Sequence, residues 1–217
     1  MSTQTQSHKF AAVILQNLPE VPEDRMQSWI ENPRALQQLL AGLNPPINGS
    51  ATVTEFPVWK TVKLRTGIDA DGYRKLIEGK KVGTQKMRIG DYANDILGKP
   101  AFTVVTEETE LDLVVVSVKE LTGKNEAPLK EIFARAKEKG LQLCPNQVGP
   151  ELRLQYEDQS KGEWVIIGME PITGSDGVLS LFSVEHNGFG LWLIAGYGRP
   201  GRIWGGHYRF VFVLPRK

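Results

Sequence analysis

The segment from Gly196 to His207 carries the side chains best suited to hold a ligand. Its sequence, GYGRPGRIWGGH, combines five glycines with two arginines and two aromatic residues. Arginines pair with anionic groups, aromatic rings offer stacking faces, and glycines let the backbone approach a ligand closely. We therefore predict a binding site at Tyr197, Arg199, Arg202, Trp204 and His207. The competing interpretation is a structural loop folded over the end of a sheet, with Trp204 filling the core.

Arg153 and Gln155 form a second pair of candidate binding residues. The segment from Glu151 to Tyr156 alternates apolar and polar side chains, which is typical of a strand. Arg153 and Gln155 would then share one face of that strand and line a groove. The alternative is that this face simply meets water.

Carboxylates near the ends of the expected strands offer a catalytic alternative. Glu151, Glu170 and Asp176 have the chemistry of a small hydrolase or nuclease, with Arg153 as the charge stabiliser. General acid–base catalysis needs two carboxylates brought together with separated pKa values, and spacing along the chain does not show such convergence. The other interpretation is that these carboxylates lie in solvated strand ends and turns.

Cysteine and histidine give weak functional signals. Cys144 is a candidate nucleophile if His186 or His207 approaches it, but a lone cysteine in Leu-x-Leu-Cys-Pro is more typical of a small buried hydrophobe. His8, His186 and His207 lack the spacing of a metal site. We therefore predict no metal and no cofactor.

The segment from Leu121 to Asn125, LTGKN, is the nearest approach to a phosphate-binding loop. Such a loop needs glycine at position 118 and serine or threonine at position 125. This chain has Val118 and Asn125 instead, so it lacks the first cradle residue and the hydroxyl that would ligate Mg²⁺. The sequence therefore argues against NTP hydrolysis.

Composition and charge narrow the functional classes. The 217 residues are 41% hydrophobic and 24% charged, with a net charge of +1, as expected of a globular protein. The single cysteine and the lack of a long apolar run predict a cytoplasmic protein that is not in a membrane. Residues 56–100 carry ten basic and five acidic side chains, a local charge of +5 that keeps nucleic-acid binding as an alternative.

Hydrophobic periodicity predicts the elements that position these side chains. The strand from Leu111 to Val118 and a helix with Leu129, Ile132, Phe133 and Ala136 on one face form the expected core unit, with Asn125 as the helix cap and Gly140 as its stop. Further strands are expected over residues 58–64, 151–156, 164–169, 178–184, 189–194 and 208–214, and shorter helices after Asp69 and over 91–97.

These elements predict an α+β protein with a mostly antiparallel sheet concentrated in its C-terminal half. We expect residues 1–8 to be a disordered tail, residues 9–50 a helical appendage with a linker, and residues 51–217 a single α+β domain.

Four blocks of the chain look familiar. The blocks are FPVWKTVKLRTG (56–67), RIGDYANDILGKPAF (88–102), GLQLCPNQVGPELRLQY (140–156) and GEWVIIGMEPITGSDG (162–177). Together they resemble an uncharacterised family of small bacterial proteins with no established activity, so the resemblance implies no catalytic residue. Our leading expectation is a non-catalytic binding module that recognises a protein or an anionic ligand, with a hydrolase or nuclease and a nucleic-acid-binding protein as alternatives.

Overall fold

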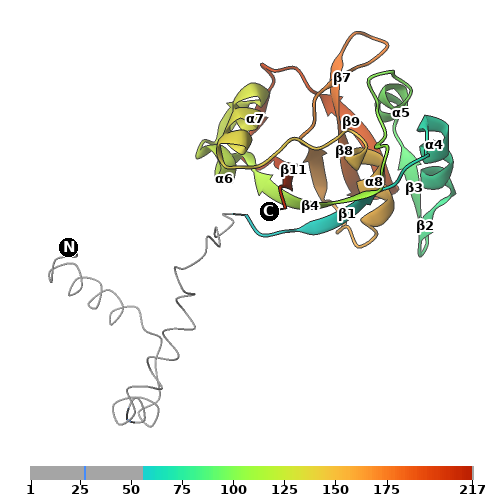
Figure 1. Ribbon diagram of the computed structural model, residues 1–217, viewed down its shortest axis with the longest axis horizontal. Helices are drawn as coiled ribbons and strands as arrows, with labels where there is room; N and C mark the ends of the chain where they lie inside the picture. Colours follow the sequence, from blue (N-terminus) through green and yellow to red (C-terminus); the bar gives the residue numbers. More distant parts are fainter. Residues whose placement is uncertain (1–26, 28–55, 217) are drawn as a thin grey trace. The chain divides into compact units, whose positions relative to one another are not determined.

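A mixed nine-stranded sheet organises residues 56–216, which with Gln27 are the residues that the computed structural model describes (Figure 1). Its strands are β1 (Lys60–Leu64), β2 (Lys81–Val82), β3 (Gln85–Ile89), β4 (Thr109–Ser117), β6 (Trp164–Ile167), β7 (Ile172–Thr173), β8 (Leu179–Asn187), β9 (Gly190–Tyr197) and β11 (Arg209–Leu214). They lie in the order β1-β4-β11-β6-β8-β9-β3-β2, with β7 paired to β8. The predicted tail (1–8) and the helical appendage with its linker (9–50) lie outside the described residues, apart from Gln27.

Most neighbouring strands of this sheet are antiparallel, whereas β11 pairs with β6 and β3 with β9 in the parallel sense. The helices are α4 (Ala70–Gly79), α5 (Asp91–Leu97), α6 (Val118–Thr122), α7 (Leu129–Glu138) and α8 (Val148–Gln155). The α+β class and the gathering of strands in the C-terminal half are therefore confirmed. A separate two-stranded sheet joins β5 (Glu126–Pro128) to β10 (Ile203–Gly205).

Two of the expected helices match their sequence signals, α4 at its start and α7 in its packing and at its end. The side chain of Asp69 accepts a hydrogen bond from the Gly72 amide and caps α4. In α7 the predicted apolar stripe is buried at Leu129, Ile132 and Ala136, which confirms that the helix packs on the core. Gly140, with φ of 81°, follows α7 in the left-handed conformation that favours glycine.

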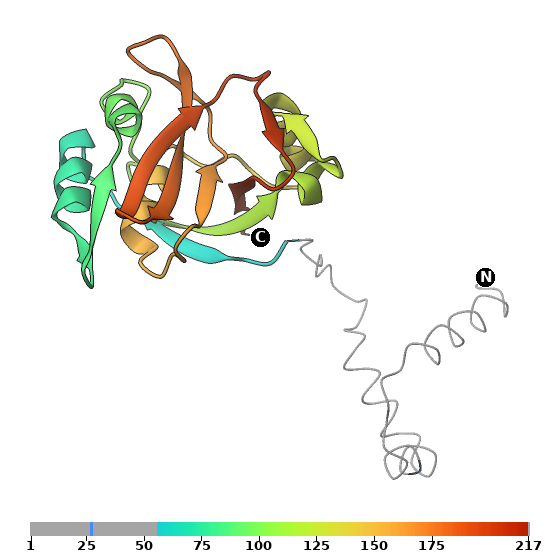
Figure 2. The same ribbon diagram turned by 180° about the vertical axis from the view of Figure 1, so that it is seen from behind.

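Helices cover both faces of the sheet. The ring of Phe133 on α7 packs edge-on against Phe210 and Phe212 of β11. On the opposite face, α8 approaches so closely that a Cβ on Gly149 would lie 2.7 Å from the Phe182 side chain of β8. The two ribbon views place α6 and α7 at one end of the sheet and α4 and α5 at the other (Figures 1 and 2).

The strand predicted over residues 151–156 is wrong, because these residues belong to α8. The helix is buried on every side from Val148 to Leu154, including Glu151 and Arg153. A helix enclosed all round has no polar face, so the 3.6-residue period that marks a surface helix is missing. Pro150 lies in its first turn, where a proline is tolerated.

The predicted cap of α7 is also wrong. The N-cap residue is Pro128, and it makes no side-chain hydrogen bond to the helix. Asn125 instead lies before β5, where its carbonyl accepts from the Gly206 amide at 2.5 Å. The first amides of α7, at Leu129 and Lys130, donate instead to backbone carbonyls of a distant segment, at Arg202 and Pro200.

Candidate functional site

The segment 196–207 is fastened to the start of α7. Its backbone carbonyls at Pro200 and Arg202 accept hydrogen bonds from the amides of Lys130 and Leu129, each at 2.9 Å. These amides lie in the first turn of α7, where backbone N–H groups have no acceptor within the helix. With the β10–β5 pairing, these bonds fix the backbone of the segment, and its Tyr197, Arg199 and Arg202 side chains are exposed.

Two of its five glycines serve the protein's own packing. A Cβ on Gly198 would lie 2.9 Å from the Pro171 Cβ and 3.0 Å from the Leu181 Cγ. A Cβ on Gly206 would lie 2.9 Å from the carbonyl oxygen of Asn125. The expectation that glycines here let the backbone approach a ligand is therefore wrong for these two positions.

The structural interpretation holds for Trp204. Its side chain is only 4% exposed and packs edge-on against Tyr208 and Phe210, with ring centroids 5.1 and 5.5 Å away. The prediction of Trp204 as a stacking face for a ligand is therefore wrong. His207 is exposed and rests on the Tyr208 ring at 4.4 Å, away from the pockets described next.

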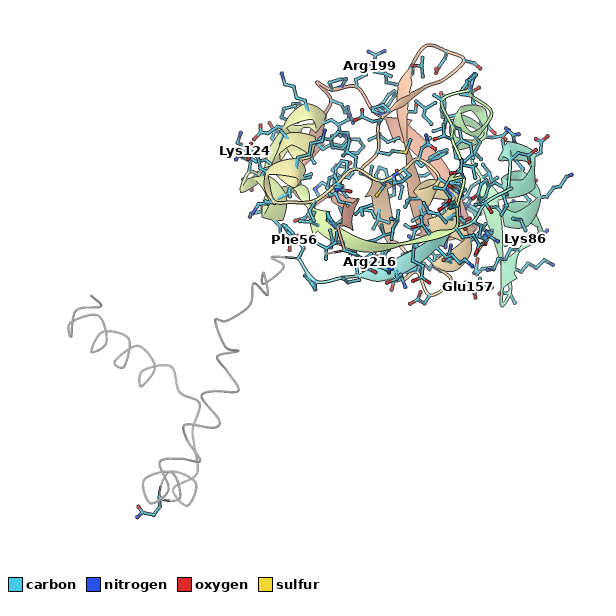
Figure 3. The ribbon with its side chains drawn as sticks, viewed as in Figure 1. Phe56, Lys86, Lys124, Glu157, Arg199 and Arg216 are labelled. Carbon is cyan, nitrogen blue, oxygen red and sulfur yellow. The ribbon has the colours of Figure 1, made fainter. Side chains whose placement is uncertain are left out.

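The remaining candidates of the segment meet at one surface pocket of about 490 Å³, lined by Tyr197, Arg199, Gly201 and Arg202. The guanidinium of Arg202 lies 5.7 Å from the Tyr197 ring centroid and 5.8 Å from that of Trp204. Within residues 56–216, neither Arg199 nor Arg202 has a carboxylate partner. Figure 3 shows the Arg199 side chain projecting outward from the segment that follows β9. We name these four residues the arginine pocket.

A smaller recess of about 130 Å³ adjoins the arginine pocket and shares Tyr197 with it. Its lining comes from α5, from the turn after β7, and from β8 and β9: Tyr92, Asp176, Val178, Ser180, Ala195, Gly196 and Tyr197. We name it the tyrosine recess. It brings together residues from three distant parts of the chain.

An ion-pair cluster holds one wall of the tyrosine recess. Asp95 on α5 accepts hydrogen bonds from the Ser175 amide at 2.7 Å and the Ser175 hydroxyl at 2.6 Å. Lys99 lies 2.9 Å from the same carboxylate and also contacts the Ser175 hydroxyl. The hydrogen bonds from Ser175, followed by that from Lys99, lower the pKa of Asp95 to about 2. The turn that carries Asp176 is thereby tied to α5.

Arg153 and Gln155 do not line a groove together, as was predicted. Gln155 lines a surface pocket of about 270 Å³ that Arg153 does not reach; its other lining residues are Lys63, Arg65, Leu76, Lys80 and Leu154. Arg153 is fully buried, and its guanidinium donates to the Gln159 side chain at 2.5 Å and to the Tyr156 carbonyl. Burial lowers the pKa of Arg153 to about 10. Gln155 is exposed and exchanges hydrogen bonds with the backbone of Lys63. Because both residues lie on a helix, they do not share a strand face.

The carboxylates proposed for catalysis have separate environments. Glu151 is fully buried and pairs with Arg65, whose Nε and Nη2 donate to it at 3.0 and 2.9 Å. The Tyr73 hydroxyl donates to the same carboxylate at 2.8 Å, and burial together with this bond raises the pKa of Tyr73. Glu170 and Asp176 are exposed, and among the described residues no group of three or more His, Cys, Asp or Glu side chains is arranged to hold a metal.

Cys144 is a small buried hydrophobe, as its Leu-x-Leu-Cys-Pro context predicts. Its thiol lies 3.4 Å from the Val211 carbonyl, and burial raises its pKa. His186 instead contacts the Gln159 carbonyl at 2.6 Å, and His207 lies on Tyr208. The third histidine, His8, lies outside the described residues.

The LTGKN segment is the end of a helix. Helix α6 stops at Gly123, whose φ of 74° is left-handed, and Lys124 pairs with Glu131 at 2.7 Å. The start of α6 has a sequence signal that we missed, because Ser117 and Glu120 form a capping box. The segment therefore ends a helix and precedes β5, whereas a phosphate-binding loop joins a strand to a helix.

Ion pairs neutralise much of the basic segment 56–100. Six of its ten basic side chains contact a carboxylate: Lys60, Lys63, Arg65, Arg74, Lys80 and Lys99. Such pairing leaves few free cations for phosphate contacts, which dominate the binding of nucleic acids.

Comparison with known proteins adds no relative. No protein-family model, curated protein or solved structure matches the chain. The resemblance to an uncharacterised bacterial family stays a prediction. In the part of the chain that the structure describes, no helix has both the length and the apolar character needed to cross a membrane.

Tyr92 is the site residue that the sequence could have revealed. The predicted buried stripe of α5 includes Ala93, Ile96 and Leu97 and leaves Tyr92 outside it. Its side chain is indeed 63% exposed. Ser180 and Asp176 carry no comparable signal, because only the fold brings them beside Tyr92.

Proposed function

We propose that this protein is a cytoplasmic binding module that recognises an anionic ligand at the arginine pocket without converting it chemically. The observation that carries this proposal is the pair of arginines, Arg199 and Arg202, which lack a carboxylate partner within residues 56–216 and line one pocket with the exposed ring of Tyr197. A guanidinium presents a fixed fork of donors that matches the oxygens of a phosphate or carboxylate.

The surroundings of these arginines favour binding over a merely solvated surface. Arg202 lies near the rings of Tyr197 and Trp204, which limits the conformations of its side chain. The backbone that carries both arginines is tied to α7 through Pro200 and Arg202. A ligand therefore meets a fixed backbone and an Arg202 side chain that loses little conformational freedom on binding.

The test is to titrate the full-length chain with phenyl phosphate by isothermal titration calorimetry. We expect the double variant Arg199→Ala/Arg202→Ala to bind at least about tenfold more weakly, because each hydrogen bond to a charged group contributes about 1.5–3 kcal/mol. We also expect added salt to weaken binding to the unsubstituted chain.

A matched control is Arg88→Ala. Arg88 is also exposed, stacks on an aromatic ring (Trp192, at 5.5 Å), and has no carboxylate partner in residues 56–216. It lies on β3, outside the arginine pocket. Equal affinity in a folded Arg199→Ala/Arg202→Ala variant, or an equal loss in Arg88→Ala, would remove the site.

A further inference from the structure

The tyrosine recess adds a second feature to the ligand. We infer that it binds a single planar ring bearing an N–H donor, so that the ligand joins such a ring to the anionic group held by the arginines. This inference rests on the proposed function, because the two pockets share Tyr197 and would hold two parts of one molecule.

The size of the recess selects one ring. Its volume is about 130 Å³, and an apolar cavity of about 150 Å³ is known to accept benzene. A six-membered ring therefore fits, whereas a fused double ring would extend out of the recess. Its lining includes Ala195, with a small side chain, and Gly196, with none.

Two exposed aromatic side chains border the recess. Tyr92 is 63% exposed and Tyr197 is 59% exposed. Among the described residues the two rings make no ring contact with each other, and Tyr92 stacks on no other ring. A planar ligand would give Tyr92 a stacking partner, and one aromatic contact improves affinity about twofold to tenfold.

The polar groups of the recess favour a ligand with a hydrogen-bond donor. Ser180 is only 5% exposed, and its hydroxyl has no hydrogen-bond partner in the described part of the chain. Asp176 uses Oδ1 to accept from the Val178 amide at 2.9 Å, and its Oδ2 has no protein partner within residues 56–216. Both oxygens line the recess and can accept a hydrogen bond from a ligand N–H, and the bond to the Asp176 carboxylate would be charge-assisted.

Charge fixes the orientation of the ligand. Asp176 would repel an anionic group placed in the tyrosine recess, whereas Arg199 and Arg202 attract it in the adjoining pocket. The ring must therefore enter beside Tyr92 and the anion must lie beyond Tyr197. A pyrimidine linked through a sugar to a phosphate has this arrangement of groups.

The walls of the recess are held in place before a ligand arrives. Asp95 and Lys99 fix the turn at Ser175, next to Asp176. On the other side, Gly198 packs against Pro171 and keeps the end of β9 in position. Preorganised walls reduce the cost of binding.

The test uses three probes with the full-length chain: cytidine 5′-monophosphate, phenyl phosphate, which has a ring without an N–H donor, and ribose 5-phosphate, which has no aromatic ring. We expect cytidine 5′-monophosphate to bind at least about tenfold more tightly than ribose 5-phosphate. Tyr92→Ala should weaken binding of the cytidine nucleotide about fivefold and leave binding of ribose 5-phosphate unchanged. Asp176→Asn should weaken binding of the cytidine nucleotide but not of phenyl phosphate, because only the nucleotide donates an N–H.

The control is Phe189→Ala, which removes another exposed ring (79%) at the β8–β9 turn, outside both pockets. Equal affinity for the nucleotide and ribose 5-phosphate, no binding of any probe, or no effect of Tyr92→Ala would overturn the inference. If Arg199→Ala/Arg202→Ala weakens all three probes while Tyr92→Ala changes none, the proposed function stands and the ring site fails. If ring-dependent binding survives the arginine substitutions, the proposed function fails instead.

Discussion

Glu151 and Arg65 form a two-point ion pair in which the Glu151 side chain is fully buried and the Arg65 side chain is 34% exposed. The Tyr73 hydroxyl and the Gln155 amide also donate to this carboxylate, at 2.8 and 3.0 Å. The pair connects α8 to the chain just after β1, and Tyr73 adds α4. It therefore joins three elements at one buried group.

Removal of this carboxylate should destabilise the fold. We expect Glu151→Ala to lower the free energy of unfolding by about 3 kcal/mol, at the low end for a broken buried pair because Arg65 is partly solvated. Urea unfolding at pH 7 measures this loss. Glu138→Ala, which breaks the exposed pair with Arg135, should change stability by less than about 0.5 kcal/mol. Similar losses in both variants would contradict the buried-pair interpretation.

The close approach at Gly198 gives a second expectation. Gly198→Ala should lower the free energy of unfolding by about 1–3 kcal/mol, because the added Cβ meets Pro171 and Leu181. Gly201→Ala is the matched control in the same segment, since nothing lies within 4 Å of a Cβ at that position. Thermal or urea unfolding of both variants checks the difference, and a neutral Gly198→Ala would show that the segment is not tightly seated.

The Asp95 cluster predicts a particular dependence of stability on pH. The pKa of Asp95 is about 2 in the folded protein, below its ordinary 3.8. Between these values the unfolded chain binds more protons, so the contribution of Asp95 is present above about pH 4 and is lost as the pH falls towards 2.

We therefore expect Asp95→Asn to lower the urea midpoint at pH 5, with the deficit shrinking as the pH approaches 2. Ser175→Ala should make stability fall less steeply between pH 4 and pH 2, because Ser175 supplies the hydrogen bonds that lower the Asp95 pKa the most. A deficit that is constant from pH 5 to pH 2 would show that the cluster does not act through the Asp95 charge.

Cys144 should be protected in the native state. Burial raises its thiol pKa, and only the thiolate reacts with iodoacetamide. We expect alkylation at pH 8 to be at least about 100-fold slower than in concentrated urea, because the residue reacts only after the structure opens. Intact-mass spectrometry gives the rate directly, since the chain has one cysteine. Comparable rates in both conditions would place the thiol at the surface.

The sequence predicted those helices and strands that have one face in the core and the other in water. The stripe of Leu129, Ile132 and Ala136 on α7 meets the core on one side and water on the other, so its period is visible. Helix α8 has no such contrast, because it is buried from Val148 to Leu154. Its apolar alternation at Leu152 and Leu154 therefore resembles the pattern of a strand.

The candidate site was predictable in its residue types but not in its geometry. Arg199 and Arg202 line a pocket near Tyr197, in the segment whose composition drew attention to it. The burial of Trp204 and the packing of Gly198 depend on contacts with distant residues, which composition does not encode. The tyrosine recess lay beyond sequence reasoning for the same reason.

The carbonyls of Pro200 and Arg202 that complete the first turn of α7 have one further consequence. Any ligand that steadies this segment must also steady the amides of Leu129 and Lys130, which donate to those carbonyls. Binding of a ligand to the arginines is thus coupled to the fraying of the first turn of α7. Hydrogen exchange at the Leu129 and Lys130 amides should slow when the ligand binds, although neither amide touches it.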